Sequence, residues 1–197
     1  MALVLIRHTR VAIADGHCYG RLDVPLAGSA AADIADVLVR VAPVTVVVSS
    51  PATRCRQLSV ALAARDGCPL QFEPALQELD FGEWEGRRWA EIDRAHSDPW
   101  ALDPWNLAPP GGESEAALWT RLQRWLEDDF AAGAAGAAGA KRLAIVAHGG
   151  PLRLLRCHFE GRPREQRWSR SLALGEVVEL GGDPRLSAPT RAGPESA

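Results

Sequence analysis

Short apolar runs alternate along the chain with segments of helical periodicity. Aliphatic runs at Ala2–Ile6, Thr45–Val48, Leu70–Phe72 and Leu143–Ala147 are each followed by a polar residue. Runs of this length and composition predict strands that are buried on both faces of a parallel sheet. A fifth run, Val177–Leu180, predicts a final edge strand.

Helices are predicted between these strands. Apolar residues recur on one face over about 28–41, and again from about 113 onward. Ser50 and Pro51 are typical of the N-cap and first position of a further helix. Strands that alternate with helices favour parallel βαβ units. We therefore expect an α/β fold, a three-layer αβα sandwich with a mostly parallel sheet and helices on both faces.

Two kinds of segment interrupt this pattern. Residues 80–112 are rich in Pro and Gly and hold Trp84, Trp89, Trp100 and Trp105. We expect an inserted lid over the carboxyl edge of the sheet, with at least two of these tryptophans serving packing alone. Residues 131–140 contain only Ala and Gly, which predicts a flexible surface connection.

The length of 197 residues fits a single domain over 1–180, followed by a disordered tail over 181–197, where Gly, Pro, Ser, Ala and Thr dominate. A net charge of -3 and a pI near 6.0 argue against a nucleic-acid partner. No apolar run approaches membrane length and no signal peptide is evident, so we expect a cytoplasmic protein without a membrane partner. The four cysteines show no CxxC spacing, which argues against a disulfide framework or a zinc site.

Candidate catalytic residues follow two of the predicted strands. Arg7-His8-Thr9 follows the first apolar run, and His148-Gly149-Gly150 follows a late one. The carboxyl ends of strands in an open α/β sheet border the ligand crevice. One histidine there could merely cap a strand, but two in the same arrangement, with an arginine beside the first, indicate an anionic substrate and a nucleophile or base acting on it.

Several stretches in order resemble a known family. They are Leu5-Ile6-Arg7-His8-Thr9, the segment 49–57 (SSPATRCRQ), the segment 78–86 (ELDFGEWEG), the segment 111–114 (GGES) and Ala147-His148-Gly149-Gly150. Together they resemble the motifs of the histidine phosphatase superfamily, also called the phosphoglycerate-mutase-like fold, and cover most of residues 2–160.

The resemblance implies a role for each motif residue. His8 would be the nucleophile that takes the phosphoryl group as a phosphohistidine, which water then hydrolyses. Arg7 and Arg54 would hold the phosphate oxygens, because a guanidinium grips two oxygens at once. His148 would add a further donor to the transferring group.

The resemblance also places a general acid at Glu78, with Glu83 as the second choice. Thr9, Tyr19 and Gly20 are possible substrate contacts. Because the family needs no metal and no carboxylate cluster demands one, we expect neither a metal nor another cofactor.

Departures from the mutase pattern favour a phosphatase. Mutases of this family usually carry Arg-His-Gly-Glu-Ser followed by Trp-Asn, whereas Thr9 and Arg10 follow His8 here. The segment 98–114 holds no Arg or Lys that would bind a bisphosphoglycerate. The short chain, Tyr19-Gly20 and the segment 23–26 (DVPL) look more like the α-ribazole phosphatase branch. The expected partner is a small-molecule phosphomonoester, and this resemblance suggests α-ribazole 5′-phosphate in cobalamin biosynthesis. The alternatives are a phosphoglycerate mutase and a non-catalytic phosphate-binding module.

Overall fold

A mostly parallel sheet lies at the centre of this computed structural model, which describes residues 2–13, 15–130 and 142–181. The order of its strands is β3-β2-β4-β1-β5, and β5 alone runs antiparallel to its neighbour, β1. The strands are β1 (Ala2–Arg7), β2 (Val46–Ser49), β3 (Leu70–Phe72), β4 (Arg142–Ala147) and β5 (Val177–Leu180). All five coincide with the predicted runs to within one residue.

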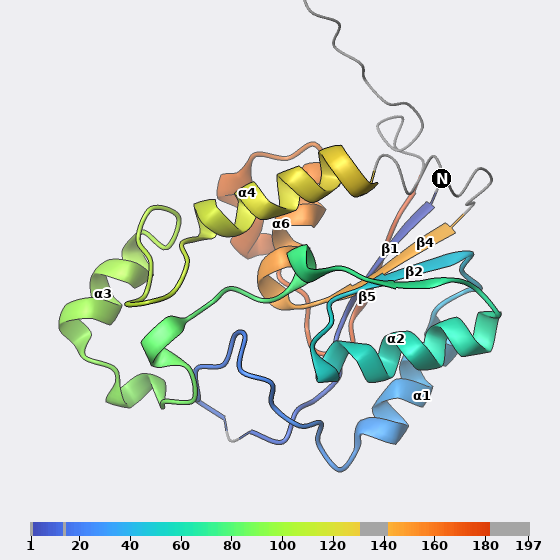
Figure 1. The fold of residues 1–197 in the computed structure, drawn as a ribbon, viewed down its shortest axis with the longest axis horizontal. Helices are drawn as coiled ribbons and strands as arrows, with labels where there is room; N and C mark the ends of the chain where they lie inside the picture. Colours follow the sequence, from blue (N-terminus) through green and yellow to red (C-terminus); the bar gives the residue numbers. More distant parts are fainter. Residues whose placement is uncertain (1, 14, 131–141, 182–197) are drawn as a thin grey trace, which may run out of the picture.

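Helices cover both faces of this sheet (Figure 1). The α-helices are α1 (Ala30–Arg40), α2 (Thr53–Asp66), α3 (Arg94–Leu102), α4 (Glu115–Trp125) and α6 (Gly149–Phe159). Short 3-10 helices span Pro74–Leu76, Gly82–Trp84, Trp89–Glu91 and Arg164–Arg170, and a π-helical turn spans Leu126–Phe130. Helices α1 and α2 lie on one face, and α4 and α6 on the other, which confirms the predicted three-layer sandwich.

The alternation of side chains along β1 explains the two layers. Leu3 and Leu5 pack into the core beneath α4 and α6, whereas Val4 and Ile6 pack into the core beneath α1 and α2. Successive residues of a strand point to opposite faces, so one uninterrupted apolar run supplies both cores.

Strand register places the polar strand ends together. Arg7 pairs with Ala147 in the parallel ladder between β1 and β4, so the next residues, His8 and His148, emerge side by side. Strand β2 ends on the other flank of β4, where the backbone N–H of Ser50 donates to the carbonyl of Val146.

The start of α2 differs from the prediction. This helix begins at Thr53 with Ala52 as its N-cap residue, not at Pro51 behind Ser50. The carboxylate of Asp23 takes the capping role: it accepts from the backbone N–H of Thr53 at 3.0 Å and from its hydroxyl at 2.6 Å. An Asp from a distant loop thus satisfies the free N–H group, and the Ser50 hydroxyl remains available for another contact.

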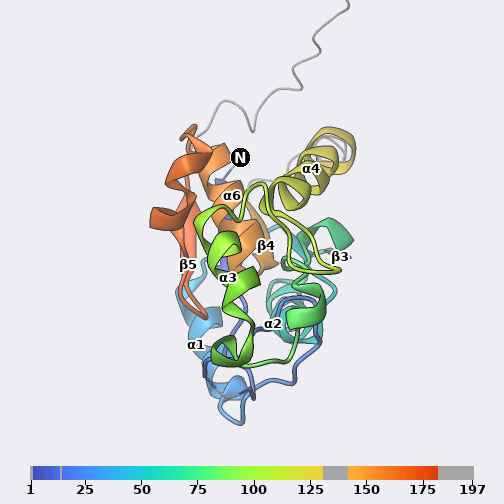
Figure 2. The same ribbon diagram turned by 90° about the vertical axis from the view of Figure 1, so that its left-hand side faces the viewer.

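The predicted lid, residues 80–112, lies beyond the carboxyl ends of the strands (Figure 1), and its helix α3 stands in front of β4 in Figure 2. Trp84 anchors this segment in a small core with Cys18 and Ile92. The predicted flexible connection and all but the first residue of the predicted tail lie outside the described residues. Within the described ranges, every helix is too short or too polar to cross a membrane.

Candidate active site

His8 is held as a neutral imidazole with one free nitrogen. Its side chain is buried, and its Nδ1 lies 2.8 Å from the carbonyl oxygen of Thr9. A carbonyl only accepts, so Nδ1 carries the proton and Nε2 keeps its lone pair. Burial, together with the charges of Arg54 and Arg7, lowers the pKa of His8 to about 3, against the opposing hydrogen bond to Thr9. His8 is therefore uncharged at neutral pH.

His148 is fixed in the other tautomer. Its ring lies edge-on to that of His8, with 5.2 Å between the centroids. The Nε atom of Arg54 donates to its Nδ1 at 3.1 Å, so Nε2 carries the proton and donates to the Ser50 hydroxyl at 2.8 Å. Burial, and then the charge of Arg54, lower the pKa of His148 well below its ordinary value.

Arg54 is a buried cation that also secures the neighbouring loop. Its two terminal nitrogens donate to the carbonyls of Leu22, at 2.9 Å, and of Gly20. Its Cζ atom lies 5.6 Å from the ring centroid of Tyr19. Gly20 has no room for a side chain, because a Cβ there would lie 2.0 Å from the carbonyl oxygen of Leu79. Tyr19 and Gly20 thus contact Arg54 directly.

Arg7 supplies a second positive charge. Its Nη1 donates to the carbonyl of Leu172 at 2.6 Å, whereas its buried Nε has no hydrogen-bond partner in the part of the chain described. The guanidinium lies against Gly149, where a Cβ would be 3.3 Å from the Cζ atom. Two guanidinium groups beside two uncharged imidazoles form a strongly anion-attracting site.

Glu78 lies at the N-terminus of α6. Its Oε1 accepts from the backbone N–H groups of Gly150 and Leu79, each at 3.0 Å. The backbone N–H groups at a helix N-terminus favour negative groups, and the same turn follows directly on His148. The side chain of Glu83, by contrast, is exposed on the lid. The structure therefore brings Glu78, and not Glu83, to the histidines.

Glu85 ties the loop beneath Arg54 to the lid. Its carboxylate accepts from the backbone N–H groups of Gly20, Arg21, Leu22 and Phe81 at 2.8 to 3.1 Å. Two of these residues, Gly20 and Leu22, present the carbonyls that hold Arg54. One carboxylate thus links the position of the arginine to the start of the lid.

A cavity of about 360 Å³ extends from Glu78 under the lid. Its other lining residues are Leu79, Phe81, Trp89, Trp100, Arg153 and Trp168. The rings of Trp89 and Trp100 are stacked, with 5.9 Å between centroids and 19° between planes. Trp84 and Trp105 lie outside this lining: Trp84 is buried with Cys18 and Ile92, and Trp105 is half-buried against the core beneath α4 and α6.

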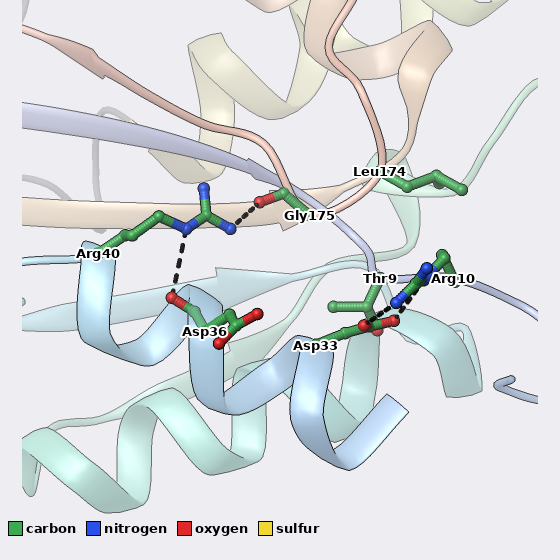
Figure 3. A pocket seen from close by; sticks show the side chains of 7 residues that line it. All are labelled: Thr9, Arg10, Asp33, Asp36, Arg40, Leu174 and Gly175. Carbon is green, nitrogen blue, oxygen red and sulfur yellow. Dashed lines mark hydrogen bonds and ion pairs between the residues drawn. The ribbon is translucent and has the colours of Figure 1, made fainter. Parts of the chain in front are cut away.

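Thr9 lines a second pocket, of about 370 Å³, on the α1 side of β1 (Figure 3). An ion pair between Arg10 and Asp33 and a hydrogen bond from Arg40 to the carbonyl of Gly175 border it. The Thr9 hydroxyl is buried and has no hydrogen-bond partner in the described ranges. Thr9 contacts His8 through its backbone carbonyl, which accepts from Nδ1. The roles of Thr9, Tyr19 and Gly20 as substrate contacts stay predictions.

The thiols near the site are poor nucleophiles. Burial raises the pKa of Cys18 and of Cys55 to about 12, although the Sγ of Cys55 lies 3.5 Å from Nε2 of His148. Where side chains are described, no cluster of three or more His, Cys, Asp or Glu is arranged to hold a metal ion.

Comparison with known proteins places this site in a family. Residues 3–189 match the family model described as the histidine phosphatase superfamily (branch 1). The chain belongs to the histidine phosphatase superfamily. The glucosyl-3-phosphoglycerate phosphatase of Mycolicibacterium vanbaalenii is 31% identical over 200 residues, which cover 93% of this chain and 85% of that protein. The adenosylcobalamin/alpha-ribazole phosphatase of Salmonella typhimurium is 30% identical over 178 residues, covering 85% and 84%.

Solved structures share the fold of this histidine phosphatase. The alpha-ribazole phosphatase from Shigella flexneri has a TM-score of 0.82 at 24% identity, covering 94% of this chain and 92% of that one. The mycobacterial glucosyl-3-phosphoglycerate phosphatase has a TM-score of 0.75 at 24% identity, covering 90% and 88%. Because both relatives named above are phosphatases of this superfamily, the chain is a phosphatase; their names carry different substrates, so they do not select one.

Sequence reasoning missed three contacts of this phosphatase site. Ser50 directly follows a strand, as His8 does, and that position could have identified it as a site residue. Gly150 touches Glu78, and Arg153 lines the cavity. Both contacts join segments far apart in the sequence, so no local pattern reveals them.

Proposed function

We propose that this phosphatase hydrolyses a small-molecule phosphomonoester through a phosphohistidine on His8. The observation that carries the proposal is the hydrogen bond from Nδ1 to the Thr9 carbonyl, which leaves the Nε2 lone pair free to attack. In the first step the Nε2–P bond forms and the bond from phosphorus to the leaving oxygen breaks. In the second, water attacks phosphorus, the N–P bond breaks, and phosphate leaves.

Arg7, Arg54, His148 and the N-terminus of α6 are proposed to hold the transferring group. Arg7, Arg54 and the first turn of α6 present N–H donors at the edge of the sheet where His8 emerges. His148, whose N–H donates to the Ser50 hydroxyl in this structure, is proposed to turn that donor to the phosphoryl group. Donors fixed in place before the reaction stabilise the charge that develops on the equatorial oxygens, and this electrostatic contribution dominates phosphoryl transfer.

Glu78 is proposed as the general acid. Its carboxyl group lies between the helix N-terminus beside His148 and the cavity under the lid. Protonated, it gives its proton to the leaving oxygen; the resulting carboxylate then accepts a proton from the attacking water, which restores the enzyme.

The cavity under the lid is proposed to hold the leaving group. Its aromatic walls suit a group with a flat or apolar face. The substrates named for the two curated relatives, α-ribazole 5′-phosphate and glucosyl-3-phosphoglycerate, are therefore the first candidates; the former would place the enzyme in cobalamin biosynthesis. A panel scored by kcat/KM should include both, with 3-phosphoglycerate, whose isomerisation in place of hydrolysis would indicate a mutase.

Rapid quench with ³²P-labelled substrate tests the intermediate. We expect acid-labile, base-stable label on the protein, lost together with turnover in His8→Ala. Label that persists in His8→Ala would move the nucleophile to another residue, with His148 first. Phosphate binding without any turnover of p-nitrophenyl phosphate by wild type would identify a binding module instead.

A further inference from the structure

Arg153 stands in the wall of the cavity under the lid. It lies one turn after Gly150 on α6, so its side chain projects from the helix face whose backbone holds Glu78. The guanidinium lies over the ring of Trp168, with 4.0 Å between Cζ and the ring centroid. Its Nη2 donates to the carboxylate of Glu115, and only 11% of the side chain is exposed.

The charges around Arg153 do not balance. Glu115 is fully buried and accepts from two guanidinium groups, that of Arg153 and that of Arg167, whose Nε lies 2.5 Å away. One carboxylate between two arginines leaves one positive charge without a partner in a poorly solvated place. The other ionisable residue of the cavity lining is Glu78, whose carboxyl oxygens already accept from the backbone N–H groups of Leu79 and Gly150.

Hydrogen-bond donors in the cavity walls are also unsatisfied. Among the described residues, Nη2 is the only side-chain nitrogen of Arg153 with a hydrogen bond, and the buried Nε has no partner. The buried indole N–H of Trp100, in the same lining, has none either. Unpaired donors are costly once solvent is excluded, so a ligand that brings acceptors into this cavity would be stabilised by them.

We propose that Arg153 is a specificity-determining residue that binds a carboxylate on the leaving group of the phosphomonoester. The guanidinium matches the two oxygens of a carboxylate, and the carboxylate adds the missing negative charge. The apolar remainder of the leaving group packs between the tryptophan rings. This inference rests on the proposed function, because it assigns the leaving group to this cavity.

Two matched substrates isolate the charge. The probes are 4-carboxyphenyl phosphate and the isosteric, neutral 4-carbamoylphenyl phosphate, together with the corresponding 3-substituted pair. In wild type we expect kcat/KM to favour the carboxylate by about 10-fold to 100-fold in at least one pair, the range for a hydrogen bond to a charged group. In Arg153→Gln this ratio of kcat/KM values should fall to the value that the two leaving groups give when nothing binds the carboxylate. Arg153→Lys should retain part of the wild-type ratio.

Arg94→Gln is the matched control, since it removes the same charge from the exposed surface of the lid; it should keep the wild-type ratio. The ratio is taken within one preparation, so loss of folded protein cancels. A wild-type ratio near 1 in both pairs, or a wild-type ratio kept in Arg153→Gln, overturns the role of Arg153. If wild type still hydrolyses p-nitrophenyl phosphate in that case, the proposed function stands; if it hydrolyses none of the probes, the proposed function fails and this inference with it.

Discussion

Replacing Gly150 by alanine should separate the delivery of a proton from the binding of phosphate. A Cβ at this position would lie 2.2 Å from Oε1 of Glu78. Ordinary contact begins at 3.4 Å, so the carboxyl group has to retreat by roughly 1 Å. The atom that moves is the end of a flexible side chain, so the fold accommodates the change. Alanine in place of glycine also favours the helix by up to about 1 kcal/mol.

The catalytic consequence follows from what Glu78 is proposed to do. A misplacement of about 1 Å costs on the order of 10²-fold in rate, and complete loss of a general acid costs about 10²-fold to 10⁴-fold. A poor leaving group needs the proton and a good one does not. We therefore expect Gly150→Ala to lower kcat/KM for an alkyl phosphate by about 10²-fold and that for p-nitrophenyl phosphate far less.

Gly149→Ala supplies the matched control in the same helical turn. Its Cβ would lie 3.3 Å from Cζ of Arg7 and so presses on the phosphate-binding side. Any loss there should be similar for all substrates, because each presents the same phosphoryl group. Values of kcat/KM plotted against leaving-group pKa should steepen for Gly150→Ala and stay parallel to wild type for Gly149→Ala. Equal losses on both substrates for Gly150→Ala would refute the role given to Glu78.

Three further predictions concern the same site. Glu78→Gln should slow alkyl phosphates by about 10²-fold to 10⁴-fold and p-nitrophenyl phosphate much less, with Glu83→Gln close to wild type; the reverse pattern would move the acid to Glu83. Activity should persist in excess EDTA, and complete loss that a divalent ion restores would contradict metal independence. Acid should destabilise the fold below pH 6.5, because the unfolded chain binds a proton on His8 that the folded chain excludes until about pH 3. In urea denaturation, the free energy of unfolding of wild type should fall between pH 8 and pH 5, and in His8→Gln this fall should be smaller by about 2 kcal/mol. An equal fall in the two proteins would contradict the buried neutral imidazole.

Features carried by local pattern were predictable, and those made by distant contacts were not. The apolar runs of β1 and β4 fix where His8 and His148 emerge, so their proximity follows from the parallel register. The prediction for Ser50 was wrong because a helix-start pattern cannot reveal that Asp23, 30 residues away, satisfies Thr53 in its place. Similarly, the segment 98–114 contains no Arg or Lys, yet the cavity under the lid has a cation because Arg153 reaches it from α6.

The position of β1 in the sheet has a consequence for biosynthesis. The strand is translated before the other four, yet its neighbours in the sheet are β4 and β5, which begin at Arg142 and Val177. Until β4 has emerged from the ribosome, the four buried apolar residues of β1 have no neighbouring strand to pair with, and such an edge invites association with other chains. The nascent chain therefore carries an aggregation-prone segment through most of its synthesis, and truncated products that end before β4 contain no assembled active site.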